Sequence, residues 1–125
     1  HGLEGSAESS YARMLLDAAA VRGWRACVLH FRDCGDYRNR LPRRYHAGET
    51  NDLRHFLHTL HETEEAAENA GPILAVGFSL GGNMALRYLA GRPDPRVRAA
   101  TTICSPIDLA GSARAIDQPA RAVYR

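Results

Sequence analysis

The sequence predicts an α/β fold built on a mostly parallel sheet with helices on both of its faces. Two observations support this fold class. Segments with helical periodicity alternate with short apolar runs typical of strands, and each strand-to-strand connection contains a helix. Such connections are typical of parallel strands joined by right-handed crossovers. The 125 residues are enough for at most one small domain.

The first half of the chain predicts one helix and one strand. The helix covers residues 11–21, after a cap at Ser9 or Ser10 and before a left-handed stop at Gly23. The strand covers residues 24–31, since its centre is an uninterrupted apolar run of the kind that is buried on both faces of a sheet. His30 within it is predicted to be a hydrogen-bonded core side chain and not a metal ligand.

Residues 32–48 are rich in Arg, Asp, Gly and Asn and are predicted to form a long irregular connection. A solvated loop is the favoured interpretation of its basic side chains, with an anionic substrate or membrane surface as alternatives; these are Arg38, Arg40, Arg43 and Arg44. A net charge of only +2, without interleaved aromatic residues, argues against a nucleic-acid partner.

The second half of the chain continues the alternation of helices and strands. A helix begins at a cap on Thr50 or Asn51, carries Leu53, Phe56, Leu57 and Leu60 on one face, and fades into an acidic stretch. The later elements are, in order, a strand over 73–78, a helix over 80–90, a strand over 98–104 and a weakly helical tail over 109–125. No apolar run is long enough to span a membrane.

Three cysteines form no C-x-x-C pair, and their number is odd. Cys27 and Cys104 lie in apolar runs and are predicted to be small buried side chains. This usage indicates a reducing compartment, and we expect a cytoplasmic protein.

The chemical motif is G-x-S-x-G, formed by Gly77, Ser79 and Gly81 between the predicted strand and helix. A serine that projects from so tight a turn takes strained backbone angles. The residues two before and two after it approach neighbouring backbone so closely that a Cβ would collide, which explains both glycines. The N-terminus of the following helix favours negative charge beside the serine.

A second turn lies upstream of the serine, where an oxyanion loop belongs in this kind of site. It consists of residues 1–5, a histidine–glycine turn that precedes a helix. Either turn alone is compatible with plain packing. Their occurrence together and in this order favours a catalytic site.

These features resemble one branch of the α/β-hydrolases, the YheT-type predicted esterases. The resemblance extends over nearly the whole chain and rests on HGLEGS at 1–6, HFR-x-C-G at 30–35, Asn39-Arg40, Tyr-His-Ala-Gly-Glu-Thr at 45–50 and GFSLGGN at 77–83. Asp33 departs from the branch, which usually has glycine there. The resemblance implies a partial α/β-hydrolase fold in which 1–125 is the central fragment of one domain, lacking both ends, and 109–125 is a possible start of the cap region.

The resemblance also implies roles for particular residues. Ser79 would be the nucleophile, and the backbone N–H groups of Leu80 and Leu3 would form the oxyanion hole. His1 would shape its turn and not act as the base. In this fold the acid and the histidine follow the serine in chain order, so we expect both beyond Arg125.

Several other polar residues have structural interpretations that we favour over functional ones. Asp108 is expected to be a turn or cap residue, with catalytic acid as the minor alternative. His46 and Glu49 are expected to brace their loop, with a substrate-side role as the alternative, and Asn83 to brace the serine turn. The spacing of His55, His58 and His61 spreads them over a helix face, and no metal or organic cofactor is expected.

The sequence therefore predicts a serine hydrolase of carboxylic esters that acts through an acyl-enzyme on Ser79. The expected partner is a small-molecule or lipid ester substrate. Alternatives are a thioester or amide hydrolase, an acyltransferase, or a catalytically silent binding module on the same fold. By resemblance, a central strand belongs between residues 24–31 and 73–78. Without it we expect either a gap or direct pairing, and a marginal, inactive fragment.

Overall fold

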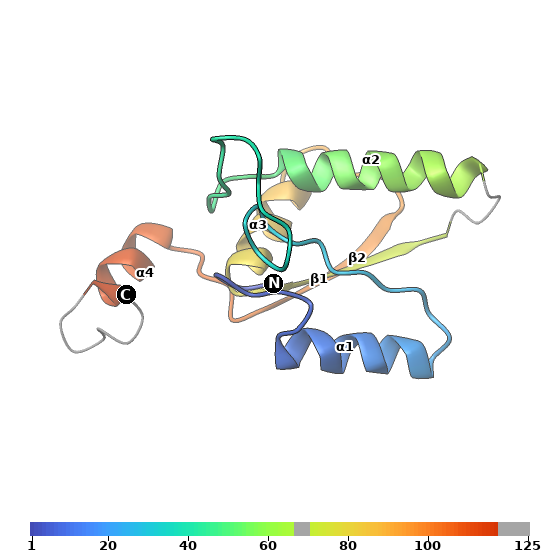
Figure 1. Ribbon diagram of the computed structural model, residues 1–125, viewed down its shortest axis with the longest axis horizontal. Helices are drawn as coiled ribbons and strands as arrows, with labels where there is room; N and C mark the ends of the chain where they lie inside the picture. Colours follow the sequence, from blue (N-terminus) through green and yellow to red (C-terminus); the bar gives the residue numbers. More distant parts are fainter. Residues whose placement is uncertain (67–70, 118–125) are drawn as a thin grey trace.

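A computed structural model describes residues 1–66 and 71–117 of the chain. Its elements are α1 (Ser10–Val21), α2 (Asn51–Ala66), β1 (Ile73–Phe78), α3 (Leu80–Leu89), β2 (Val97–Ile103) and α4 (Leu109–Ile116), shown in Figure 1. These bounds confirm five of the predicted helices and strands to within a residue or two, and also the helical start of the tail. The predictions for 67–70 and 118–125 lie outside the described residues.

The sheet consists of β1 and β2, which run parallel with α3 as their connection. The register places Phe78 opposite Ile103, so both strands end at the same edge. The Ser79 N–H continues the ladder by donating to the Ile103 carbonyl at 2.8 Å. The residues that follow both strands therefore meet at the carboxyl edge, where ligands bind in sheets of this kind.

Helices cover both faces of this sheet, as predicted (Figure 1). α2 and α3 lie on one side of the strands and α1 lies on the other. Contact of α1 with β1 includes the rings of Tyr11 and Phe78, whose centroids are 4.5 Å apart. On the other side, Phe31, Cys34 and Met84 form a buried cluster, and partly buried hydrophobic side chains pack against it, namely Leu29, Tyr45, Leu53 and Leu80. No helix in the described part of the chain combines the length and apolar character needed to cross a bilayer.

The predicted strand over residues 24–31 is wrong. These residues are not paired into any sheet among those described, and Ala26 and Cys27 are exposed. A strand needs a neighbour that pairs with its backbone groups, and β1 hydrogen-bonds only to β2 in the described structure. Direct pairing of residues 24–31 with β1, one of the two expected arrangements, is absent from the described structure. His30 is hydrogen-bonded as predicted, since it accepts from the Ala7 N–H at 2.8 Å, but it is exposed.

The prediction that Cys27 and Cys104 are buried is also wrong, because both are exposed. Cys27 belongs to the uncovered apolar run. Cys104 follows β2 with φ of +53°, where the chain turns away from the sheet. Cys34, within the irregular connection, is the buried cysteine, and none of the three is in a disulfide.

At the helix ends, the predicted glycine stop is confirmed, whereas the N-terminal caps differ from the prediction. Gly23 has φ of +67° and ends α1 in the left-handed conformation. Ser9 occupies the N-cap position of α1, but its hydroxyl accepts from the Ser6 N–H and makes no cap bond. At α2 the Asn51 N–H is bound by the side chain of Glu49, at 2.7 Å. The Glu49 carboxylate therefore caps the start of α2, a role predicted for Thr50 or Asn51.

Candidate active site

Ser79 lies at the junction of β1 and α3, on the carboxyl edge of the sheet. Its φ of +50° and ψ of −117° place a non-glycine residue in a sparsely populated region. Such strain persists only when the surrounding structure imposes it, and it is concentrated at functional sites. Ser79 is half-buried at this edge.

The two glycines of the motif are required by close backbone contacts. A Cβ on Gly77 would lie 2.6 Å from the Gly81 carbonyl oxygen and from the Gly82 Cα. A Cβ on Gly81 would lie 2.5 Å from the His1 carbonyl oxygen. All of these neighbours are backbone atoms that cannot rotate away. The structure thus confirms the reason given for the spacing of the motif.

The turn over residues 1–5 packs directly against the serine turn. The Gly81 N–H donates to the His1 carbonyl at 3.0 Å. Gly2 is buried, and a Cβ on it would lie 3.4 Å from the Ser79 Cβ. Within the described residues, no hydrogen bond uses the backbone N–H of Leu3 or Leu80. Two motifs more than seventy positions apart in the sequence therefore form one site.

Both ring nitrogens of His1 are engaged in holding its own turn. Nε2 accepts from the Phe31 N–H at 3.0 Å, and Nδ1 lies 2.7 Å from the Gly2 carbonyl oxygen. These partners fix the neutral tautomer with the proton on Nδ1, because Nε2 must be the acceptor. Neither nitrogen is left to accept a proton from Ser79. The geometry agrees with the predicted turn-shaping role.

The Tyr-His-Ala-Gly-Glu-Thr stretch braces the irregular connection. Glu49 is 4% exposed, and its carboxylate binds Arg43 and the Asn51 N–H. His46 uses Nδ1 to accept from the Gly48 N–H within the same turn. These contacts support the structural interpretation of both residues.

Sequence reasoning did not single out Tyr45 and Glu4, whose side chains join this connection to the turn over 1–5. The signal that could have identified Tyr45 is its position as the first residue of the Tyr-His-Ala-Gly-Glu-Thr stretch at 45–50. Their proximity itself depends on the fold, because the two residues are 41 positions apart.

Other predicted residues lie away from Ser79 or support its surroundings. Asp108 is the N-cap of α4 and accepts from the Gly111 N–H at 2.8 Å, as favoured. The side-chain amide of Asn83 donates to the Pro106 carbonyl at 2.9 Å and so ties α3 to the segment after β2. His58 lies 3.4 Å from Glu62 along α2. In the described parts of the chain, no group of three or more His, Cys, Asp or Glu side chains could hold a metal ion.

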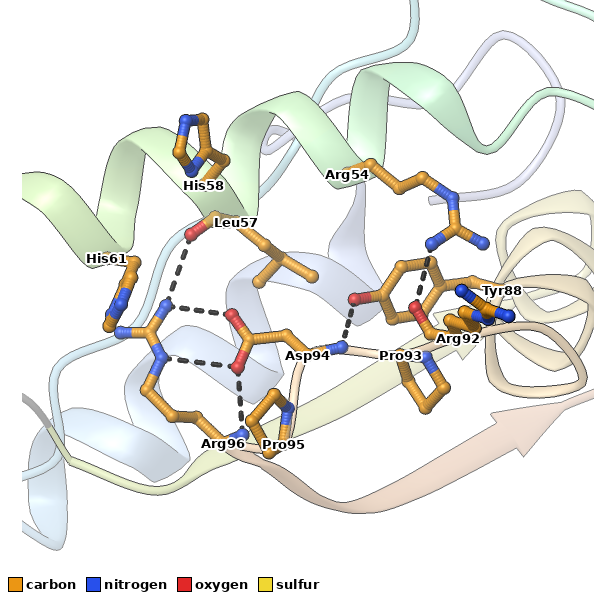
Figure 2. Close-up of a pocket in the computed structure, with 10 residues that line it drawn as sticks. All are labelled: Arg54, Leu57, His58, His61, Tyr88, Arg92, Pro93, Asp94, Pro95 and Arg96. Carbon is orange, nitrogen blue, oxygen red and sulfur yellow. Dashed lines mark hydrogen bonds and ion pairs between the residues drawn. The ribbon is translucent and has the colours of Figure 1, made fainter.

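A hollow between α2 and the 91–96 segment lies at the opposite, amino edge of the sheet (Figure 2). Its polar groups bind one another: Arg96 pairs with Asp94 at 3.0 Å, and the Asp94 N–H donates to the Tyr88 hydroxyl at 2.6 Å. Arg54 donates to the Arg92 carbonyl at 2.8 Å. These bonds close the connection between α3 and β2 against α2. The hollow is therefore a packing feature, remote from Ser79.

Comparison with known families agrees with this geometry. Residues 1–124 match the model of the alpha/beta hydrolase fold family. The chain belongs to this family. No solved structure matches the chain at a significant level.

Within the α/β-hydrolases, the chain is similar to several named proteins. It is 42% identical to a candidate esterase, YheT of Escherichia coli (strain K12), over the whole chain and 36% of that protein. It is 34% identical to the embryogenesis-associated protein EMB8 of Picea glauca, over 86% of the chain and 23% of that protein. It is 32% identical to human phospholipase ABHD3, over 80% of the chain and 24% of that protein. The similarity to YheT confirms the expected branch, and the chain spans about a third of that relative's length.

The structure also explains the departure at Asp33. This residue has φ of +65°, in the left-handed region where glycine is favoured. Aspartate is among the residues that tolerate this region best, since its short polar side chain can bond locally. Here its carboxylate accepts from the Asn39 N–H at 3.0 Å. An aspartate is therefore compatible with the left-handed conformation at this position.

Proposed function

We propose that the protein containing this chain is a serine hydrolase that cleaves carboxylic esters through an acyl-enzyme on Ser79. The observation that carries the proposal is the position of Ser79. It is held in a strained turn at the carboxyl edge of the sheet, against Gly2 of the N-terminal turn. Relatives named as an esterase and a phospholipase suggest short-chain or lipid acyl esters as the substrate class.

In the proposed reaction a histidine base removes the proton from the Ser79 hydroxyl, and the oxygen attacks the ester carbonyl carbon. The alcohol leaves with a proton returned by the base, and water then hydrolyses the acyl-enzyme. Members of this fold place the acid and the histidine after the serine in chain order. The engaged nitrogens of His1 are consistent with a base elsewhere in the full-length protein.

The negative oxygen that forms during each step would be bound by backbone N–H groups. We assign this role to Leu80 and Leu3, whose N–H groups make no hydrogen bond among the described residues. Leu80 begins the ten-residue α3, so the helix dipole adds positive potential at the same point. Each such donor can contribute about 3 kcal/mol to the stabilisation of a transition state.

Covalent labelling of the full-length protein tests the proposal. A fluorophosphonate probe should add one adduct to the wild type, detected by intact mass, and none to Ser79→Ala. Ser10→Ala is the matched control, because Ser10 is exposed at the start of α1, and it should label like the wild type. Hydrolysis of a series of nitrophenyl esters then identifies the acyl length preferred.

The alternatives give different results in the same experiment. An acyltransferase or a thioester or amide hydrolase would be labelled on Ser79 but would prefer a different acyl donor or acceptor. A folded wild-type protein without any adduct would overturn the proposal. It would favour a binding module that has kept the fold without its chemistry.

A further inference from the structure

The turn that carries Leu3 has an unusual backbone conformation. The Gly5 N–H donates to the Gly2 carbonyl at 3.1 Å and closes a four-residue turn. Glu4, the third residue of this turn, has φ of +53°. Glycine is the usual residue at this position, because a Cβ disfavours positive φ. The surrounding structure must hold a glutamate in this conformation, and contacts from outside the turn can do so.

Tyr45 supplies that contact. Its hydroxyl donates to Glu4 Oε1 at 2.5 Å, from the irregular connection 41 positions away in the chain. Burial of Tyr45 and its hydrogen bond to Glu4 raise its pKa well above the usual value, which favours the protonated hydroxyl. Tyr45 is therefore the donor of this hydrogen bond and Glu4 the acceptor.

The tyrosine ring is fixed on the same aromatic side chain that holds the other end of the turn. It stacks on Phe31 with centroids 4.8 Å apart and an interplanar angle of 12°. Phe31 is 7% exposed, packs edge-on against the His1 ring at 4.6 Å, and donates its backbone N–H to His1 Nε2. Both ends of the turn are thus tied to one buried residue.

The same scaffold reaches the second proposed oxyanion donor. Phe31 belongs to the buried cluster with Cys34 and Met84, and the side chains of Tyr45 and Leu80 both pack against that cluster. A displacement of Tyr45 would therefore be transmitted to Glu4 directly and to Leu80 through shared packing.

We propose that Tyr45 is a positioning residue of the oxyanion site, which holds Glu4 and with it the Leu3 N–H in place. This role rests on the proposed function. If Glu4 were released, its φ could relax to a negative value. Rotation of the Leu3–Glu4 peptide changes ψ of Leu3 together with φ of Glu4, and the shift in Leu3 would tilt the preceding Gly2–Leu3 peptide, which carries the Leu3 N–H. A donor misplaced by about 1 Å loses much of its effect on a transition state.

The variant that tests this role in the full-length protein is Tyr45→Phe, which keeps the stacked ring and removes only the hydroxyl. Tyr37→Phe is the matched control, because Tyr37 lies in the same connection and is 65% exposed. Glu4→Ala removes the acceptor, whereas Glu4→Gln retains an oxygen that can accept from Tyr45. The readouts are the rate of Ser79 labelling by a fluorophosphonate, kcat and KM for an activated ester, and the melting temperature.

We expect Tyr45→Phe to lower kcat and the labelling rate by about tenfold, with KM within about twofold of the wild type. Glu4→Ala should give the same loss, the double variant no more than either alone, and Glu4→Gln should recover most of it. Tyr37→Phe should resemble the wild type in every readout. A role in loop stability alone would instead lower the melting temperature and leave kcat per folded molecule unchanged.

Two outcomes would overturn the inference in distinguishable ways. Equal labelling rates and kcat values for the wild type and Tyr45→Phe would reject the positioning role and leave the proposed function intact. An unlabelled, folded wild-type protein would reject the proposed function and the positioning role together.

Discussion

The contact between Gly81 and the N-terminal turn makes the assembly of the site measurable. A Gly81→Ala substitution would place a Cβ 2.5 Å from the His1 carbonyl oxygen and 3.0 Å from the His1 nitrogen. Because favourable contacts between such atoms are about 3.5 Å long, the two segments must separate by about 1 Å. This overpacking costs about 1–3 kcal/mol. Weakening the Gly81–His1 hydrogen bond adds about 1 kcal/mol.

We therefore expect Gly81→Ala to lower the free energy of unfolding of the full-length protein by about 2–4 kcal/mol, measured by urea denaturation. The displaced turn should also slow Ser79 labelling by a fluorophosphonate, by about a hundredfold for a shift of this size. Gly71→Ala is the matched control, since no heavy atom of the described residues, its chain neighbours apart, lies within 4 Å of a Cβ there. Its free energy of unfolding should stay within about 1 kcal/mol of the wild type.

Comparison of the two variants tests whether the N-terminal turn packs against the serine turn. If Gly81→Ala unfolds at the same urea concentration as Gly71→Ala and is labelled at the wild-type rate, the two turns do not pack as described. A loss of stability without any loss of labelling would show that the contact supports the fold but does not position the serine site.

Three further predictions follow from the polar contacts and from burial. In a urea titration, Glu49→Ala should lower the free energy of unfolding by about 1–3 kcal/mol, because Arg43 and the Asn51 N–H lose their buried partner. The control Glu62→Ala removes an exposed carboxylate and should change the free energy of unfolding by less than about 0.5 kcal/mol. Arg96 holds the pKa of Asp94 below its ordinary value of 3.8, so this carboxylate stabilises the fold fully above that pH, and the contribution disappears as the pH falls through the lowered value. Unfolding measured between about pH 5 and pH 2 should show a shallower loss for Asp94→Asn, and an unchanged slope would contradict the assignment. The isolated 125-residue chain should melt without a cooperative transition, since no described side chain is less than 2% exposed and Trp24 and Leu74 are more than half exposed. A sharp calorimetric peak together with ester turnover would refute this prediction.

The elements with local signals could be predicted from the amino-acid sequence. The strand at 73–78, the serine turn and α3 follow from an apolar run, two glycines and helical periodicity, all within about twenty positions. The collision that requires Gly77 involves backbone only four or five residues away, so the spacing of the motif is enough to predict its cause. Gly23 is a similar case, because a left-handed helix end needs no distant partner.

Features that depend on a partner from elsewhere in the chain could not be predicted in this way. The apolar run within 24–31 had the composition of a strand, yet a strand forms only where a neighbour pairs with its backbone, and none of the described residues does so. Cys27 is exposed for the same reason. The bonds from His1 to Gly81 and from Tyr45 to Glu4 join residues 80 and 41 positions apart, which sequence spacing cannot bring together. Local propensity thus determined the serine turn, and packing between distant segments determined the surface on which that turn lies.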